Sequence, residues 1–169
     1  IFDPHRYGLY GISKQFAHEA VIGYRSQLHV SNAVLYSHTS PRQDRRFLAP
    51  TIAATVARAA RGENVRLRLT DVKGVRDWGY APDYARALPL IARADPGDYT
   101  VATGQTRAVW EFAEAALDAV RLDWDAVVDV EQGPVAPEEA PADIGPIEAL
   151  GWKPETRFRE MVRLMVEAA

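Results

Sequence analysis

Cysteine is absent from this chain, which excludes disulfide bonds, thiolate nucleophiles and zinc–thiolate sites. Apolar runs are short, well below the roughly 20 residues that a membrane-spanning helix requires, and no basic-then-apolar signal segment opens the sequence. Basic residues show no excess, because the formal net charge is −3, so nucleic acid is not an expected partner. We therefore expect a cytoplasmic protein with no membrane contact.

A glycine-rich phosphate turn is missing too, since neither GxGxxG nor GxxGxxG occurs anywhere in the sequence. Folds of the α/β class that bind dinucleotides carry such a turn after their first strand. The sequence also begins at Ile1 rather than at methionine. We expect it to be the later part of a longer polypeptide.

Hydrophobic and charged residues make up 47% and 25% of the 169 residues, as in a globular protein. Apolar spacing predicts a first helix over residues 13–28, with a buried face formed by Phe16, Ala17, Ala20, Val21 and Tyr24. The other expected elements are helices over 51–62, 81–94, 108–120 and 156–169, strands over 30–37, 64–70 and 99–103, and a loop over 131–146. Pro89 should kink the 81–94 helix or end it early. The alternation of helices and strands predicts an α/β fold with crossover connections.

Tyr10 and Lys14 are four residues apart at the start of the first expected helix. Residues at this spacing share one helix face, so the lysine ammonium can stabilise a tyrosine phenolate. Tyr10 would then be a usable base near neutral pH. Taken alone, the same spacing is also that of one turn of an ordinary amphipathic helix.

Further motifs follow in order along the chain, namely YGISK, AVLYSHTSPR, VRDWGYAPDYARAL, YTVATGQTRAVWEFAEAA and ALGWKPETRFREMV. Over nearly its whole length the sequence resembles the GDP-mannose 4,6-dehydratase family of extended short-chain dehydrogenases/reductases. RDWG and ATG point to this family in particular. YxxxK and LGWKP are shared more widely among nucleotide-sugar enzymes.

The resemblance implies an α/β fold made of the C-terminal part of an NAD(P)-binding Rossmann-like domain and a smaller α/β substrate-binding part. Residues 1–38 would supply the catalytic helix and a strand of the Rossmann-like core. Residues 39–169 would form mainly the substrate-binding part, with some segments returning to the core. The glycine-rich cofactor-binding half would lie upstream of Ile1.

The resemblance also implies roles for individual side chains. Tyr10 would take the proton from the sugar C4 hydroxyl while the C4 hydride passes to NADP, with NAD as the alternative, and Lys14 would assist Tyr10. The residues implied to contact the cofactor are Tyr10, Lys14, Tyr36, His38 and Arg42, and those implied to contact the nucleotide sugar are Ser37, Phe47 and Arg76. His5, His18 and His29 lack metal-ligand spacing, so we assign no metal.

Several positions depart from the family pattern. Ser37 stands where the family has asparagine, Thr39 where it has glutamate, and Gln43 and Ala136 where it has arginines. The glutamate that acts at C5 and C6 in the family belongs to a Ser/Thr-x-Glu motif just upstream of Ile1. The departures suggest an altered sugar nucleotide, an altered reaction or a reduced activity.

Three functions remain open on this evidence. The first is a dehydratase that converts GDP-mannose, or a related nucleotide sugar, to the 4-keto-6-deoxy sugar. The second is an epimerase or reductase of the same extended family, which removes no water. The third is a diverged, non-catalytic homologue that binds a nucleotide sugar. In each case the resemblance implies that the 13–28 helix joins copies of the chain in a homodimer or homotetramer.

Overall fold

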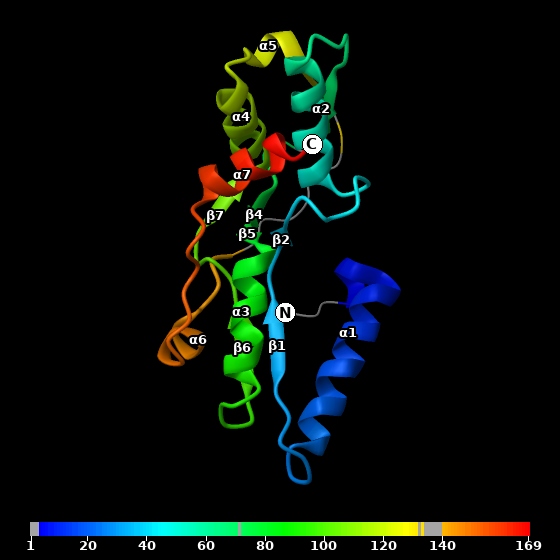
Figure 1. The fold of residues 1–169 in the computed structure, drawn as a ribbon. Coiled ribbons are helices and arrows are strands. Elements are labelled where there is room, and N and C mark those ends of the chain that lie inside the picture. The colour runs from blue at the N-terminus through cyan, green and yellow to red at the C-terminus, as the bar shows by residue number, and fades with distance from the viewer. Residues whose placement is uncertain (1–3, 71, 132, 134–139) are drawn as a thin grey trace.

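The computed structural model describes residues 4–70, 72–131, 133 and 140–169 (Figure 1). Its helices are α1 (Pro4–Tyr24), α2 (Leu48–Ala60), α3 (Ala81–Ile91), α4 (Val109–Val120), α5 (Trp124–Val127), α6 (Gly145–Ala149) and α7 (Phe158–Glu167). Its strands are β1 (Asn32–Leu35), β2 (His38–Thr39), β3 (Leu67–Leu69), β4 (Val75–Asp77), β5 (Gly79–Tyr80), β6 (Asp98–Val101), β7 (Thr106–Ala108) and β8 (Val128–Val130). The chain therefore has the α/β composition that the sequence predicts.

The strands pair two by two, and most pairs join strands that are distant in the sequence. β1 pairs with β6, β2 with β5 and β3 with β8, all in parallel, whereas β4 and β7 are antiparallel. Parallel neighbours require crossover connections, and helices supply them here. The crossover topology that the sequence predicts is thus confirmed.

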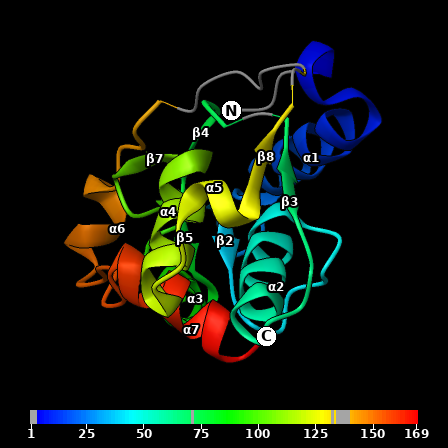
Figure 2. The same ribbon diagram turned by 90° about the horizontal axis from the view of Figure 1, so that it is seen from above.

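A helical lobe, which we define as α2, α4 and α7 with the strands β3, β4, β7 and β8, contains the larger core. The three helices lie against one another in both views (Figures 1 and 2). Ile52, Phe112 and Val162 are completely buried between them. The Phe112 ring lies 5.0 Å from that of Trp78 and 5.9 Å from that of Phe158, measured between centroids, so the RDWG motif is packed into this lobe.

A second, smaller core lies between α3 and the β1–β6 pair. Its buried side chains are Tyr84, Ala87, Ile91, Val101, Ile147 and Trp152. The segment that contains α6 and Trp152 therefore packs beside strands that come much earlier in the chain. Helix α3 contains Pro89 and ends at Ile91, three residues before the predicted end, as expected of a proline that ends a helix early.

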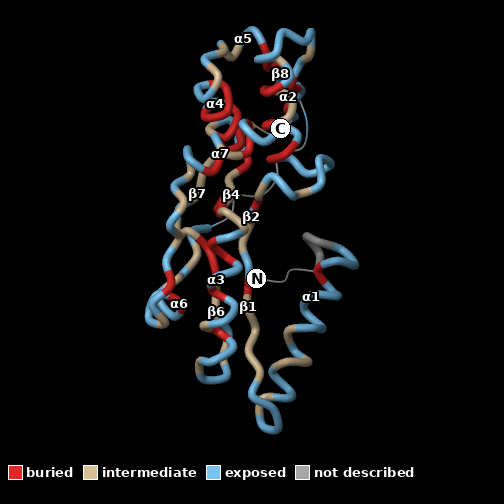
Figure 3. Tube along the Cα trace, viewed as in Figure 1, coloured by how far each residue is buried: buried red, intermediate tan, exposed pale blue. Residues whose placement is uncertain are grey.

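Helix α1 differs most from its prediction. It begins at Pro4 and ends at Tyr24 instead of spanning residues 13–28, and it is kinked at Gly8, whose φ of 55° suits a residue without Cβ. Its expected buried face is wrong, because Phe16 is 75% and Tyr24 is 55% exposed (Figure 3). Apolar periodicity marks a face that can be covered, but no described part of this chain covers Phe16. None of the described helices has both the length and the apolar character needed to cross a membrane.

Candidate active site

Tyr10 and Lys14 lie in the helical turns that follow the Gly8 kink. The Lys14 Nζ atom is 5.4 Å from the centroid of the Tyr10 ring, within the range of a cation–π contact. The Ser13 hydroxyl donates a hydrogen bond of 2.7 Å to the Tyr10 carbonyl oxygen. Tyr10 is 68% exposed, so its phenol is accessible to a reacting molecule.

Helix α1 runs antiparallel to β1, so its first turns lie level with the carboxyl end of that strand (Figure 1). The carboxyl ends of parallel strands are where α/β proteins bind ligands. Tyr36, Ser37 and His38 directly follow β1. The fold thus places the helix of Tyr10 and the segment of His38 toward the same end of the β1–β6 pair.

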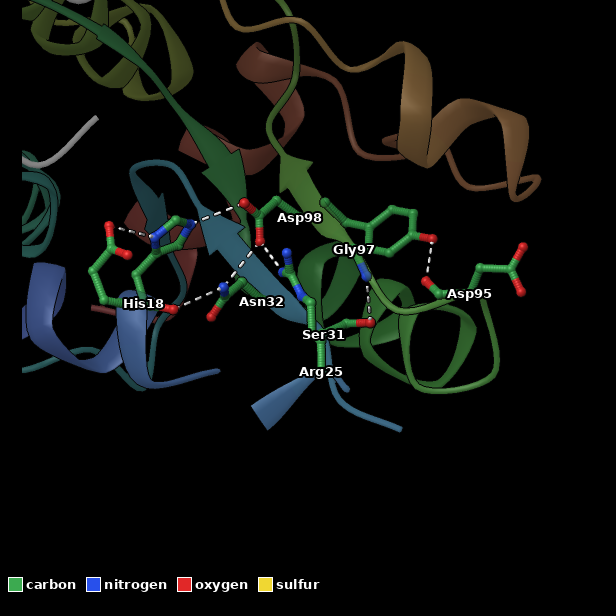
Figure 4. A network of polar contacts seen from close by, with 9 residues as sticks. His18, Arg25, Ser31, Asn32, Asp95, Gly97 and Asp98 are labelled. Carbon is green, nitrogen blue, oxygen red and sulfur yellow. Dashed lines mark hydrogen bonds and ion pairs between the residues drawn. The ribbon is translucent and has the colours of Figure 1, made fainter. Parts of the chain in front are cut away.

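A polar network around Asp98 holds the second half of α1 to this strand pair (Figure 4). The Asp98 carboxylate accepts hydrogen bonds of 3.0 Å from His18 Nε2 and 2.9 Å from the Asn32 amide, and it forms an ion pair with Arg25. The Asn32 amide also reaches the His18 carbonyl oxygen at 3.4 Å. Residues of α1, β1 and β6 therefore meet at one carboxylate.

The pKa of Asp98 reflects two opposing effects. Partial burial acts to raise the pKa, but the hydrogen bonds from Asn32, Arg25 and His18 together outweigh burial and hold it below its ordinary value. Asp98 therefore remains a carboxylate at neutral pH. Its contacts orient α1, the helix that carries Tyr10 and Lys14.

The segment from Tyr36 to Thr39 is fixed by backbone hydrogen bonds to its neighbours. The Tyr36 N–H donates to the Val101 carbonyl at 3.0 Å, and the Gly79 N–H donates to the Ser37 carbonyl at 2.9 Å. His38 Nδ1 donates to the Tyr36 carbonyl at 2.8 Å, because a carbonyl can only accept. Tyr36 and Ser37 are half-buried while His38 is exposed, so the segment presents His38 to solvent.

The loop between β2 and α2 contains two other predicted site residues. Arg42 is exposed, with its backbone N–H 3.3 Å from the Ser40 hydroxyl, and Phe47 is 56% exposed directly before α2. Thr39 and Gln43, two of the departures from the family pattern, bond to each other through Oγ1 and Oε1 at 2.6 Å. Where the family has a glutamate and an arginine, this chain therefore has two neutral side chains that are hydrogen-bonded to each other.

Arg76 is the first residue of the RDWG motif and lies on β4. It is half-buried, and its Nη1 donates to the Val75 carbonyl at 2.8 Å. The neighbouring Asp77 is fully buried and accepts bonds of 2.8 and 2.7 Å from the Thr103 N–H and hydroxyl. This contact joins the RDWG and ATG motifs. Ala136, the fourth departure, lies outside the described residues.

Two supporting residues were not predicted from the sequence. The buried Asp83 carboxylate accepts from the backbone N–H groups of Glu155 and Thr156, at 3.0 and 2.8 Å. The Tyr84 ring packs against the His38 imidazole with centroids 5.1 Å apart. Both residues lie in the sequence WGYAPDY, but residue spacing alone does not show that β5 pairs with β2 and so brings this segment beside His38. The described residues include no cluster of three histidine or acidic side chains placed to bind a metal ion.

A profile of the GDP-mannose 4,6 dehydratase family matches residues 4–165. The chain belongs to this family. GDP-mannose 4,6 dehydratase 1 of Arabidopsis thaliana is 33% identical over 165 residues, an alignment that covers 94% of this chain and 46% of the plant protein. The chain thus spans less than half the length of that relative.

Solved structures support the same fold. RMD from Pseudomonas aeruginosa, complexed with NADPH, matches with a TM-score of 0.82 at 24% identity, over 94% of this chain and 55% of that chain. UDP-glucose 4-epimerase of Thermus thermophilus, in complex with NAD, matches with a TM-score of 0.75 at 27% identity, over 94% and 53% of the two chains. These similarities confirm the extended short-chain dehydrogenase/reductase fold that the motifs imply.

Proposed function

We propose that this chain forms the later part of a nucleotide-sugar 4,6-dehydratase that acts on GDP-mannose or a related nucleotide sugar. The observation that carries the proposal is the position of the Lys14 ammonium over the ring of the exposed Tyr10. Both residues lie in the first turns of α1, level with the carboxyl end of β1. Family membership supports dehydration over the epimerase, reductase and non-catalytic alternatives. Residues 1–38 would belong to the cofactor-binding core and residues 39–169 mainly to the substrate-binding part.

The donor set fits an NADP or NAD cofactor, which neighbours of the same fold bind. His38 donates through Nδ1 to Tyr36, which leaves Nε2 for a ligand, and the exposed Arg42 offers a cation for a phosphate. We assign cofactor contacts to Tyr10, Lys14 and Tyr36 as well. When bound, the nicotinamide supplies the hydride acceptor and donor that make the overall reaction redox-neutral.

Tyr10 then acts on the sugar as a base. Its phenol oxygen is proposed to take the proton from the C4 hydroxyl, and the Lys14 ammonium, 5.4 Å from the centroid of the Tyr10 ring, is proposed to assist this transfer. The C4 ketone makes the C5 proton more acidic, so that the C5 proton and the C6 hydroxyl group can leave together as water. Ser37, Phe47 and Arg76 are proposed to hold the nucleotide sugar, and Arg76 offers a guanidinium suited to a diphosphate.

We also propose that copies of the chain associate as a homodimer or homotetramer through α1. Leu9, Ile12 and Phe16 on this helix are 85%, 50% and 75% exposed. Contiguous exposed apolar residues of this kind mark interaction surfaces. Sedimentation velocity across a range of protein concentrations measures the association directly.

The test of the proposed function is incubation of the protein at its full native length with GDP-mannose and NADP, followed by mass spectrometry of the sugar nucleotide. We expect loss of one water and a product rate that falls by about 10²-fold or more in Tyr10→Phe. Tyr24→Phe, which changes an exposed tyrosine on the same helix, should retain the wild-type rate. A product of unchanged mass would favour epimerisation, and an unaffected Tyr10→Phe would exclude the role of Tyr10.

A further inference from the structure

His38, one of the residues predicted to contact the cofactor, has two side-chain contacts that define how its ring lies. Its Nδ1 atom donates to the Tyr36 carbonyl at 2.8 Å, which fixes one direction in the plane of the ring. A single hydrogen bond leaves the imidazole able to tilt about that direction. The face of the ring needs a second contact, and Tyr84 provides it at a centroid distance of 5.1 Å and an interplanar angle of 32°.

Gly79 allows Tyr84 to reach this position. The parallel pairing of β2 and β5 sets His38 opposite Gly79. A Cβ atom at Gly79 would lie 2.1 Å from the Tyr84 Cε2 atom, which is shorter than any real contact. The Tyr84 ring therefore occupies the space of the missing Gly79 side chain.

Tyr84 is buried and packs against Trp152. It is 1% exposed, and the Trp152 ring meets it edge-on at 6.0 Å. The Trp152 Nε1–H donates to the Asp83 carbonyl at 2.9 Å, so the two aromatic residues are tied to the start of α3. Residues of β5, α3 and the LGWKP segment therefore pack together next to the exposed His38.

We propose that Tyr84 is a positioning residue that holds the His38 imidazole in the Nδ1–H tautomer and thereby presents Nε2 as the acceptor toward the bound ligand. The inference rests on the proposed function for the identity of that ligand, a nicotinamide dinucleotide. The observed contacts that support this orientation are those of His38 with Tyr36 and Tyr84, and Gly79 leaves the space that Tyr84 needs. Tyr84 acts through His38 and touches no reacting atom.

The first readout is ¹⁵N NMR of the histidine ring nitrogens in the full-length protein. In wild type we expect a proton-bearing Nδ1 and an acceptor-type Nε2 for His38. In Tyr84→Leu the imidazole loses the aromatic ring that packs against its face, so that it can tilt away from the Tyr36 carbonyl. The Nε2–H tautomer should then become the major form. Tyr84→Phe keeps the ring and should restore the wild-type pattern.

The matched control is Tyr99→Leu. Tyr99 packs at the edge of the same core and bonds to the Asp95 carbonyl, so its loss weakens the core without touching His38. Tyr84→Met fills the buried space with a flexible side chain and replaces Tyr84→Leu if that variant does not fold. An unchanged His38 tautomer in a folded Tyr84→Leu or Tyr84→Met variant would overturn the proposal.

The second readout is NADPH titration followed by fluorescence. We expect Tyr84→Leu to raise the NADPH Kd by about three- to tenfold, the scale of one aromatic pair, and Tyr84→Phe to leave it unchanged. In a His38→Ala background the Tyr84→Leu substitution should add no further weakening. Absence of NADPH and NAD binding in wild type would refute the proposed function, whereas the tautomer measurement would still decide the role of Tyr84.

Discussion

The helical lobe and helix α1 are built on different physical principles. In the helical lobe, Ile52, Phe112 and Val162 are 0% exposed, whereas on α1 Leu9 and Phe16 are 85% and 75% exposed (Figure 3). Burial of apolar surface stabilises the lobe. Helix α1 is positioned within the described chain by polar contacts around Asp98. The helix that carries Tyr10 and Lys14 thus has the weaker and more condition-dependent attachment.

Substitution of one phenylalanine in each region tests this difference most strongly. Phe112→Ala removes a ring packed between Trp78 and Phe158, and it should lower the free energy of unfolding by about 3–5 kcal/mol. Phe16→Ala should change it by less than about 0.5 kcal/mol in the monomeric chain. Urea unfolding at low protein concentration measures both values. Equal losses would mean that α1 is as well packed as the lobe.

A buried carboxylate provides the second test. Asp83→Ala leaves the N–H groups of Glu155 and Thr156 without the carboxylate that accepts their hydrogen bonds. The substitution should lower the free energy of unfolding by about 3 kcal/mol. Asp44 offers a matched control, because its exposed carboxylate bonds to the nearby Arg46, and Asp44→Ala should leave the unfolding midpoint near that of wild type. A small effect of Asp83→Ala would show that the LGWKP segment is anchored mainly by Trp152.

Spacing predicted those parts of the fold in which one helix or strand determines its own pattern. The 108–120 prediction agrees closely with α4, and the 30–37 prediction contains β1. Strands β2 and β5 are two residues long, too short for any alternation, and they exist only because they pair with each other. The exposed face of α1 shows a related limit, since periodicity identifies an apolar face without identifying what covers it.

The candidate site divides in the same way. The four-residue spacing placed Tyr10 and Lys14 on one helix face, a local property that the sequence contains. Tyr84 could not be assigned to His38 from the sequence, because their contact depends on the pairing of β2 with β5 and on the space left by Gly79. Contacts between distant segments are therefore the part of the site that required a structure.

The smallest expected effect is the acid sensitivity of α1. The folded-state pKa of Asp98 lies below its ordinary value, so its contribution to stability is complete above about pH 3.9, the usual aspartate pKa, and is lost as the pH falls through the lowered pKa. Asp98 is 41% exposed, so solvent screening limits this contribution to about 1 kcal/mol or less.

Hydrogen exchange of the α1 amides between about pH 2 and pH 6 measures this attachment, with the α4 amides as an internal reference for the change of intrinsic exchange rate. In wild type, the protection of α1 relative to α4 should decrease toward the acid end of this range. Asp98→Asn removes the titrating group and should show reduced relative protection of α1 that no longer varies with Asp98 protonation. A steep acid response that persists in Asp98→Asn would assign the sensitivity to another carboxylate. A further loss of relative protection on acidification in wild type but not in Asp98→Asn would show that one titratable contact helps to hold the Tyr10 helix against β1 and β6.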